Sequence, residues 1–256
     1  INYFARNFDN ILIGRYYGSN ALGFYSKAYQ LLMMPITNLR DPMTRVAMPA
    51  LSRLQNEPEQ YRNYYKKYIS ILAFISMPLV TFMFVCSDQL ILLLLGPQWT
   101  EASNIFKILA IAALIQPVST TWGLVLLSTG NGKRYLRWGI VNSIVIVISF
   151  CCGLPWGGEG VAVGYAIANY LLLYPTFLYA FKSTPIRMKD FFSSVVSPFL
   201  GSIFMGVVCF FVSQYLHSFG VFLILALCFV SSLLSYVFSF ILMSGGLQDL
   251  QEYYSY

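Results

Sequence analysis

Two long segments in the last quarter of the chain, residues 191–215 and 219–243, contain no charged residue. Each exceeds the roughly 20 residues that a helix needs to cross the hydrocarbon core of a bilayer. The whole chain is 57% hydrophobic and 10% charged, whereas a soluble domain carries about 25% charged residues. Such a chain cannot cover its own surface with polar groups, so its composition indicates a protein of the membrane.

Apolar stretches of similar length recur along the chain, separated by turn-forming residues such as "GSN" at 18–20 and "PWGGEG" at 155–160. Runs such as "ILLLLG" and "IVIVIS" do not alternate apolar and polar residues, which argues against a β-barrel. The sequence therefore predicts an all-α, polytopic membrane helix bundle with about eight transmembrane helices, the first of them truncated. The expected spans are 1–17, 21–52, 66–95, 103–128, 134–154, 158–181, 191–215 and 219–243.

Basic residues gather in alternate loops between these spans. The opposite loops and their edges hold only Arg15, Lys27 and Lys107. By the positive-inside rule the basic loops are cytoplasmic, together with residue 1 and the tail 244–256. The net charge of +6 then follows from topology, and no nucleic-acid partner is needed. The basic loops hold Arg53, Arg62, Lys66, Lys67, Lys133, Arg134, Arg137, Lys182, Arg187 and Lys189.

The stretch "PITNLRDPMTRVAMP", residues 35–49, places charge inside a hydrophobic span. On a helical wheel Arg40, Asp41 and Arg45 share an arc of roughly 160° with neighbouring polar residues. A central Arg or Asp that faces lipid costs about 2.5–3.5 kcal/mol even on lenient insertion scales. This face is therefore expected to meet water or protein.

The first segment repeats the pattern, because Arg6, Asp9 and Asn10 share a helix face and each acid has a base three or four residues away. Three arginines against two acids predict an anion-facing cavity. The alternative is structural ion pairing, or arginines that extend to the membrane interface. The expected cavity residues are Arg6, Asp9, Asn10, Arg40, Asp41, Arg45 and Gln116, the last at a kink before Pro117.

Other motifs predict packing rather than chemistry. Gly160, Gly164 and Ala168 are spaced four apart, as in membrane helices that approach closely. No carboxylate pair supports glycosyl-transfer catalysis, so no catalytic residue is predicted. One histidine, His217, and cysteines without C-x-x-C spacing predict no disulfide framework and no metal site. The cysteines are Cys86, Cys151, Cys152, Cys209 and Cys228.

Three stretches of the chain resemble the second half of bacterial polysaccharide transporters. These are lipid-linked oligosaccharide flippases of the multidrug/oligosaccharidyl-lipid/polysaccharide exporter superfamily, and the chain is most similar to colanic-acid and teichuronic-acid exporters. The resemblance covers essentially the whole chain. The stretches are "FDNILIGRYYGSNALGFYSKAYQLLMMP", "MPALSRLQNEPEQYRNYYKK" and "LLGPQWTEASNIFKILAIAALIQPVSTTWGLVLLSTGNGK".

The resemblance implies two six-helix lobes around a central cavity, with two additional helices. Residues 1–181 would form the second lobe, 191–243 the C-terminal helix pair and 244–256 a cytoplasmic tail, with the N-terminal lobe of the same polypeptide missing. The implied substrate is an oligosaccharide repeat unit on undecaprenyl diphosphate, flipped across the bacterial inner membrane. No cofactor is implied, and coupling to a proton or sodium gradient is left open.

Two other functions are compatible with parts of the sequence. A multidrug or lipid II exporter of the same superfamily would share the architecture, although drug cations favour an acidic cavity. A membrane-embedded glycan polymerase or ligase would need long outer loops, whereas the expected outer loops are only a few residues long. The sequence therefore favours a transporter over an enzyme.

Overall fold

The computed structural model describes residues 2–182, 184–216 and 219–243, with side chains for 7–182, 184–216 and 219–242. These residues contain helices and no strand, so the predicted all-α bundle is confirmed. The side chain of Arg6, His217 and the predicted tail 244–256 lie outside the described residues. The helices are α1 (Asn2–Arg53), α2 (Pro58–Val85), α3 (Ser87–Leu94), α4 (Ala102–Ser119), α5 (Thr121–Ser128), α6 (Gly132–Gly153), α7 (Gly157–Phe181), α8 (Met188–Tyr215) and α9 (Val221–Met243).

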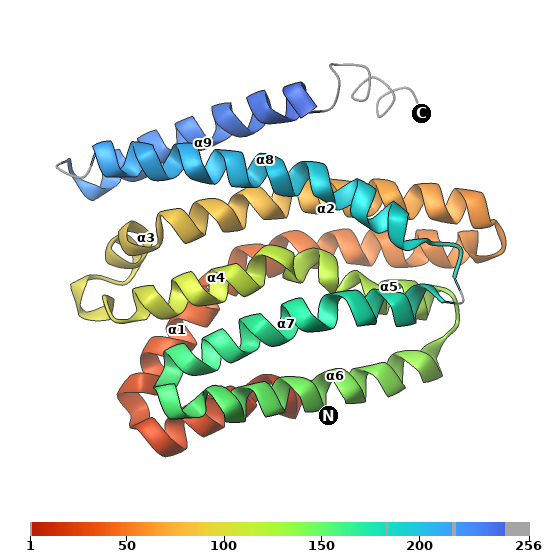
Figure 1. Ribbon diagram of the computed structural model, residues 1–256, viewed down its shortest axis with the longest axis horizontal. Helices are drawn as coiled ribbons and strands as arrows, with labels where there is room; N and C mark the ends of the chain where they lie inside the picture. Colours follow the sequence, from red (N-terminus) through yellow and green to blue (C-terminus); the bar gives the residue numbers. More distant parts are fainter. Residues whose placement is uncertain (1, 183, 217–218, 244–256) are drawn as a thin grey trace.

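The long helices lie side by side and reverse direction from one to the next (Figure 1). α4 packs between α2 and α7, α1 packs against α4, and α6 pairs with α7. α8 packs along α2 and α9 packs on α8, so this pair forms a layer at one edge of the bundle. Apolar side chains fill the contacts, as in the buried cluster around Tyr25, Phe106 and Leu109.

One predicted boundary is a bend inside α1, and two predicted spans are each divided by a break. Gly18 has φ +81° and separates α1 into two helical halves, at the predicted "GSN" boundary; only glycine adopts this backbone conformation at little cost. Cys86 separates α2 from α3, and Thr120 separates α4 from α5. Pro117 lies just before the second of these breaks, where its missing N–H removes one helical hydrogen bond.

Within the described residues, five helical stretches are long and apolar enough to cross a membrane. One of them, Gly132–Phe181, comprises both α6 and α7, and α1 is not included. The count of eight spans therefore stays a prediction. The other four stretches are Pro58–Val85, Ala102–Ser128, Met188–Tyr215 and Val221–Leu242.

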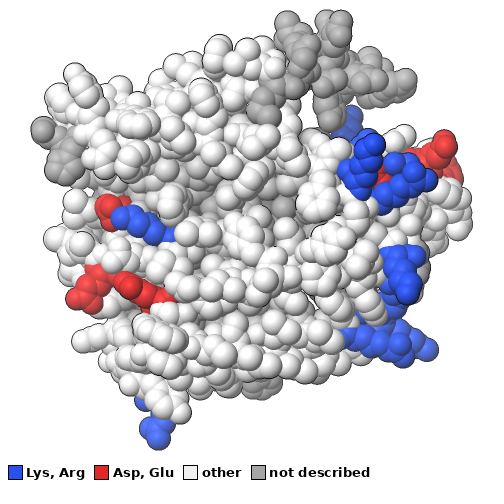
Figure 2. Space-filling view, viewed as in Figure 1, with Lys and Arg blue, Asp and Glu red and all other residues white. Residues whose placement is uncertain are grey.

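Lys and Arg side chains gather at one end of the molecule (Figure 2). There α1 ends and α2 begins, and the α5–α6 and α7–α8 connections lie at the same end (Figure 1). Between this end and the few charged side chains at the opposite end, most of the face shown consists of uncharged residues (Figure 2). The basic end is the one that the positive-inside rule assigns to the cytoplasm.

The contact between α6 and α7 depends on glycine. A Cβ on Gly160 would lie 2.2 Å from the carbonyl oxygen of Gly153, and one on Gly164 would lie 2.4 Å from that of Ser149. Both obstacles are backbone atoms, which cannot turn aside. The predicted close approach at Gly160 and Gly164 is confirmed.

Replacing Gly160 with Ala is expected to lower stability by about 1–3 kcal/mol, because the added methyl forces α6 and α7 apart. Gly139→Ala is the matched control, since a Cβ there meets nothing within 4 Å. Thermal unfolding of both variants in detergent tests this. Equal midpoints would show that the glycine contact contributes nothing.

Candidate substrate cavity

A cavity of about 750 Å³ lies among α1, α4, α5, α6 and α7, with Tyr68 of α2 at its wall. No described residue of α8 or α9 lines it. Its walls combine charged, amide, hydroxyl and aromatic side chains. The lining includes Asp9, Arg40 and Asp41; Asn7, Asn10, Gln116, Asn142 and Asn169; Thr37, Thr44, Ser119, Thr120, Thr121, Ser143 and Thr176; and Tyr25, Tyr29, Trp122, Tyr135, Phe150, Tyr165 and Phe177.

Asp9 is buried in the first half of α1, with 4% of its surface exposed. The Tyr25 hydroxyl donates to Asp9 Oδ2 at 2.9 Å, and the Asn10 backbone N–H donates to Oδ1 at 2.8 Å. Tyr25 belongs to the second half of α1, so this hydrogen bond ties the two halves together across the Gly18 bend. Among the described side chains, no base forms an ion pair with Asp9, and the predicted partner Arg6 lies outside them.

Arg40 and Asp41 form an ion pair in the second half of α1. Arg40 Nε and Nη2 both donate to Asp41 Oδ1, at 3.0 and 2.8 Å. The Arg40 side chain is 17% exposed and that of Asp41 is 49% exposed, so the pair lies at a partly open part of the wall. One turn further on, the Thr44 hydroxyl lies 3.1 Å from that of Tyr68 and fixes α1 against α2.

Arg45 is a predicted site residue that the described lining does not include. The residue is exposed and does not line the cavity, and within the described residues Asp41 pairs with Arg40 rather than with Arg45. Around the helix, Arg45 lies about 140° from Arg40 but only about 40° from Asp41. Its exposed position outside the described lining, rather than the wheel, separates Arg45 from the other predicted residues.

Gln116 does lie in the wall, next to the break between α4 and α5. Its Nε2 donates to the Tyr165 hydroxyl at 3.1 Å. At the break, the hydroxyls of Ser119, Thr120 and Thr121 each donate to the backbone carbonyl three residues earlier. Pro117 has removed one backbone hydrogen bond at this break. The interrupted helix presents polar groups to the cavity at membrane depth, where irregular backbone is tolerated if it lines a cavity.

Sequence reasoning missed the aromatic part of the wall. Trp122 and Tyr135 stack with ring centroids 5.0 Å apart, and Phe150 and Tyr165 stack at 5.8 Å. The run "QPVSTTW", 116–122, was the available signal, since three hydroxyl residues and a tryptophan follow a proline inside an apolar span. The stacked pairs bring α5 to α6 and α6 to α7, which the sequence pattern alone does not specify.

The described part of the lining holds one cation, Arg40, and two carboxylates, Asp9 and Asp41. It therefore does not show the arginine excess that the sequence predicted. Hydroxyls, amides and aromatic faces outnumber the charges, and the lining described contains neither Cys nor His. The hydroxyls and amides suit a hydroxyl-rich ligand, with which they can exchange hydrogen bonds.

The chain is similar in sequence to known polysaccharide biosynthesis proteins. Residues 1–104 match the family described as "Polysaccharide biosynthesis protein". The chain is 30% identical over 217 residues to the teichuronic acid biosynthesis protein TuaB of Bacillus subtilis (strain 168), covering 83% of this chain and 44% of that protein. It is 23% identical over 172 residues to the lipopolysaccharide biosynthesis protein WzxC of Escherichia coli (strain K12), covering 67% of this chain and 35% of that protein. The chain is a relative of these polysaccharide biosynthesis proteins.

The predicted resemblance to bacterial polysaccharide transporters is thereby confirmed. The fold is similar to that of the lipid II flippase MurJ in an inward closed conformation, with a TM-score of 0.75 and 17% identity over 96% of this chain and 52% of that one. The chain spans less than half the length of the two curated relatives. With this fold and its apolar helices, the chain is a multi-pass integral membrane protein.

Cysteine accessibility tests whether the cavity holds water. In a background with Cys151→Ser and Cys152→Ser, a cysteine replacing Thr120 is expected to react with a charged, membrane-impermeant thiol reagent. A cysteine replacing Leu171, which is 71% exposed on α7, is expected to react at least about tenfold more slowly, because lipid excludes both the reagent and the reactive thiolate. Equal rates would contradict a water-filled cavity.

Proposed function

We propose that the chain forms one half of a flippase that moves oligosaccharide repeat units on undecaprenyl diphosphate from the inner to the outer leaflet of the bacterial inner membrane. The observation that carries this proposal is the polar, aromatic-walled cavity inside an otherwise apolar bundle. Polar side chains at membrane depth are costly and commonly mark the path of a polar substrate. The names of the relatives support a polysaccharide substrate, and the undecaprenyl diphosphate carrier is what the resemblance to polysaccharide transporters implies.

The composition of the wall matches what a glycan needs. Amides and hydroxyls donate to and accept from sugar hydroxyls, while ring faces such as Trp122 cover the apolar faces of sugar rings. The Asn10 Oδ1 atom is buried and has no hydrogen-bond partner among the described residues, so a donor on the substrate would satisfy it. At about 750 Å³, the cavity falls within the range of about 300–1,000 Å³ of small-ligand sites.

Arg40 is the described residue best suited to an anionic group of the substrate. A guanidinium carries five N–H donors, of which the bonds to Asp41 use part. The remaining donors form a planar fork that matches a diphosphate or a sugar carboxylate. Asp41 holds this fork in position, so the acid positions the base rather than cancelling its role.

The proposal includes a second lobe of the same polypeptide, packed across the cavity, with which the described helices would alternate access. Support comes from the length of the relatives, of which the chain covers less than half. The bend at Gly18 and the break at Thr120 are the places where α1 and the α4–α5 pair can change shape. Residues on the turns that flank the Thr120 break line the cavity.

Lipid II export is the second candidate, because the MurJ fold covers 96% of the chain. Lipid II and a polysaccharide repeat unit are both lipid-linked glycans, so the same wall chemistry serves either. The two functions differ in the intermediate that accumulates when the protein fails. A glycan polymerase or ligase is not favoured by any residue of the described cavity.

Replacing Arg40 with Ala is expected to reduce surface glycan about tenfold or more, since hydrogen bonds to charged groups contribute about 1.5–3 kcal/mol. Arg45→Ala is the matched control, because Arg45 lies on the same helix but outside the cavity. Surface glycan and the inner-leaflet lipid-linked intermediate are measured in a deletion strain that carries the intact polypeptide, with membrane abundance confirmed.

The outcomes of this experiment are distinct. Accumulation of the polysaccharide intermediate in Arg40→Ala alone supports the proposal, whereas accumulation of lipid II supports the second candidate. Normal export in Arg40→Ala overturns the role of the cavity. A loss of abundance in Arg40→Ala but not in Arg40→Lys would identify a structural charge.

Asp9 is expected to carry the coupling ion. It is held by neutral donors among the described residues, so exchange of a proton or a sodium ion breaks no ion pair within that part of the chain, whereas Asp41 would have to leave Arg40. Asp9→Asn should therefore abolish flipping driven by an imposed pH or sodium gradient in proteoliposomes, while Asp41→Asn retains gradient dependence. Gradient-driven flipping by Asp9→Asn would exclude Asp9 as the coupling group.

A further inference from the structure

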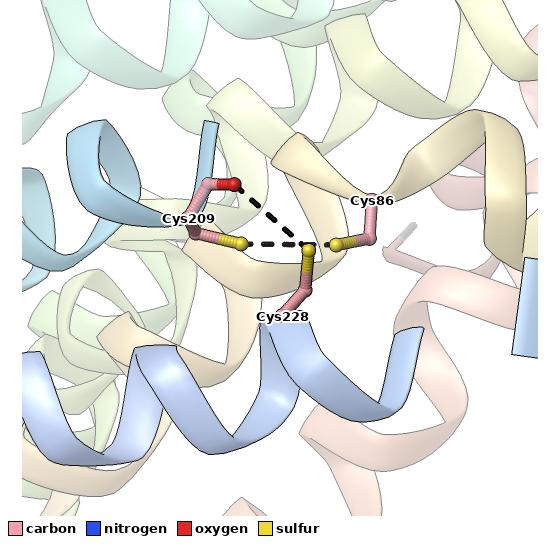
Figure 3. Close-up of side chains that lie close together, drawn as sticks. All are labelled: Cys86, Cys209 and Cys228. Carbon is pink, nitrogen blue, oxygen red and sulfur yellow. Dashed lines mark hydrogen bonds between the residues drawn. The ribbon is translucent and has the colours of Figure 1, made fainter. Parts of the chain in front are cut away.

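Three cysteines that no sequence motif connects meet at the edge of the bundle. Cys86 lies at the break between α2 and α3, Cys209 lies on α8 and Cys228 lies on α9 (Figure 3). All three are fully buried, and their sulfur atoms lie within 4.8 Å of one another. The Cys86 and Cys209 sulfurs are 3.8 Å apart, and the Cys228 sulfur lies 3.9 Å from the Cys209 carbonyl oxygen.

This spacing matches sulfurs that share a metal ion. With a metal–sulfur bond of about 2.3 Å, two sulfurs on one ion lie about 3.8–4.0 Å apart in tetrahedral or trigonal geometry. The 3.8 Å between Cys86 and Cys209 falls at this value. A disulfide requires an S–S bond of about 2.05 Å, so the three cysteines are free thiols.

The ligand set decides the kind of metal. Within the described residues, the cluster offers three sulfur ligands and no His, Asp or Glu. Thiolates select soft ions, and structural zinc almost always takes four ligands. We propose that Cys86, Cys209 and Cys228 form a three-coordinate site for a soft monovalent ion, Cu(I).

A buried hydroxyl accompanies the three sulfurs. Ser232, one helical turn after Cys228, is buried, and its hydroxyl is directed at the Cys209 sulfur. Buried polar atoms are normally satisfied, and a thiolate sulfur on a bound metal would be a stronger acceptor for this hydroxyl than a thiol.

Binding needs no oxidant. Cu(I) forms three Cu–S bonds, each thiol that becomes a thiolate releases one proton to solvent, and the metal stays Cu(I). Affinity should therefore fall as the pH is lowered. The site joins α8 and α9 to the α2–α3 break and shares no residue with the described cavity lining. It is independent of the proposed flippase activity.

The test uses the intact polypeptide, purified reduced in detergent and titrated with Cu(I) against a chromogenic Cu(I) chelator. We expect one tightly bound Cu(I), with X-ray absorption showing three sulfur neighbours. Cys228→Ser should weaken binding by at least about 100-fold, since even outer-shell changes cost 10–100-fold. The matched control, Cys151→Ser with Cys152→Ser, removes the two exposed cysteines and should leave binding unchanged.

Each other result contradicts the proposal. Loss of binding in the exposed-cysteine control would place the metal elsewhere, and binding of Zn²⁺ in preference to Cu(I) would exclude a three-coordinate soft site. Absence of Cu(I) binding in the unaltered protein would leave three packed thiols only. If Cys228→Ser does not fold, the sulfur count from X-ray absorption of the unaltered protein decides between these results.

Discussion

Hydrocarbon offers no hydrogen bonds, so every polar group placed at membrane depth must find its partner within the protein. Continuous helices meet this requirement for the backbone, which explains why the described chain is helical almost throughout. The interruptions are the exceptions, and they need other donors. At the α4–α5 break, side-chain hydroxyls from Ser119 to Thr121 bond the carbonyls of the preceding turn. The break is tolerated because it lies against the polar cavity rather than against lipid.

The same requirement arranges the charges of α1. Asp9 is satisfied by Tyr25 and by the Asn10 backbone, and Arg40 is satisfied by Asp41. Both arrangements leave hydrogen-bonding capacity directed at the cavity while keeping the apolar face of α1 packed on α4. Arg45 has no such partner among the described residues and lies outside the cavity.

The sequence predicted the helical class, the boundary at Gly18 and the close contact at Gly160, because each depends on local chemistry or on spacing along one helix. It also selected Asp9, Asn10, Arg40, Asp41 and Gln116, all of which line the cavity. It could not select Tyr25 or Trp122, since an aromatic residue in an apolar span looks the same whether it faces lipid, core or cavity. Nor could it find the cysteine cluster, whose members are separated by 123 and 19 residues and meet only through helix packing.

Long-range contacts of this kind also hold α8 and α9 in place. At the basic end, Arg62 of α2 donates to both carboxylate oxygens of Asp190 at 2.6 Å, and Asp190 also caps the start of α8. Midway, the Tyr236 hydroxyl of α9 donates to the Phe74 carbonyl of α2. Cys86, Cys209 and Cys228 lie toward the opposite end. The pair is therefore fastened to α2 along its length, while none of its described residues lines the cavity wall.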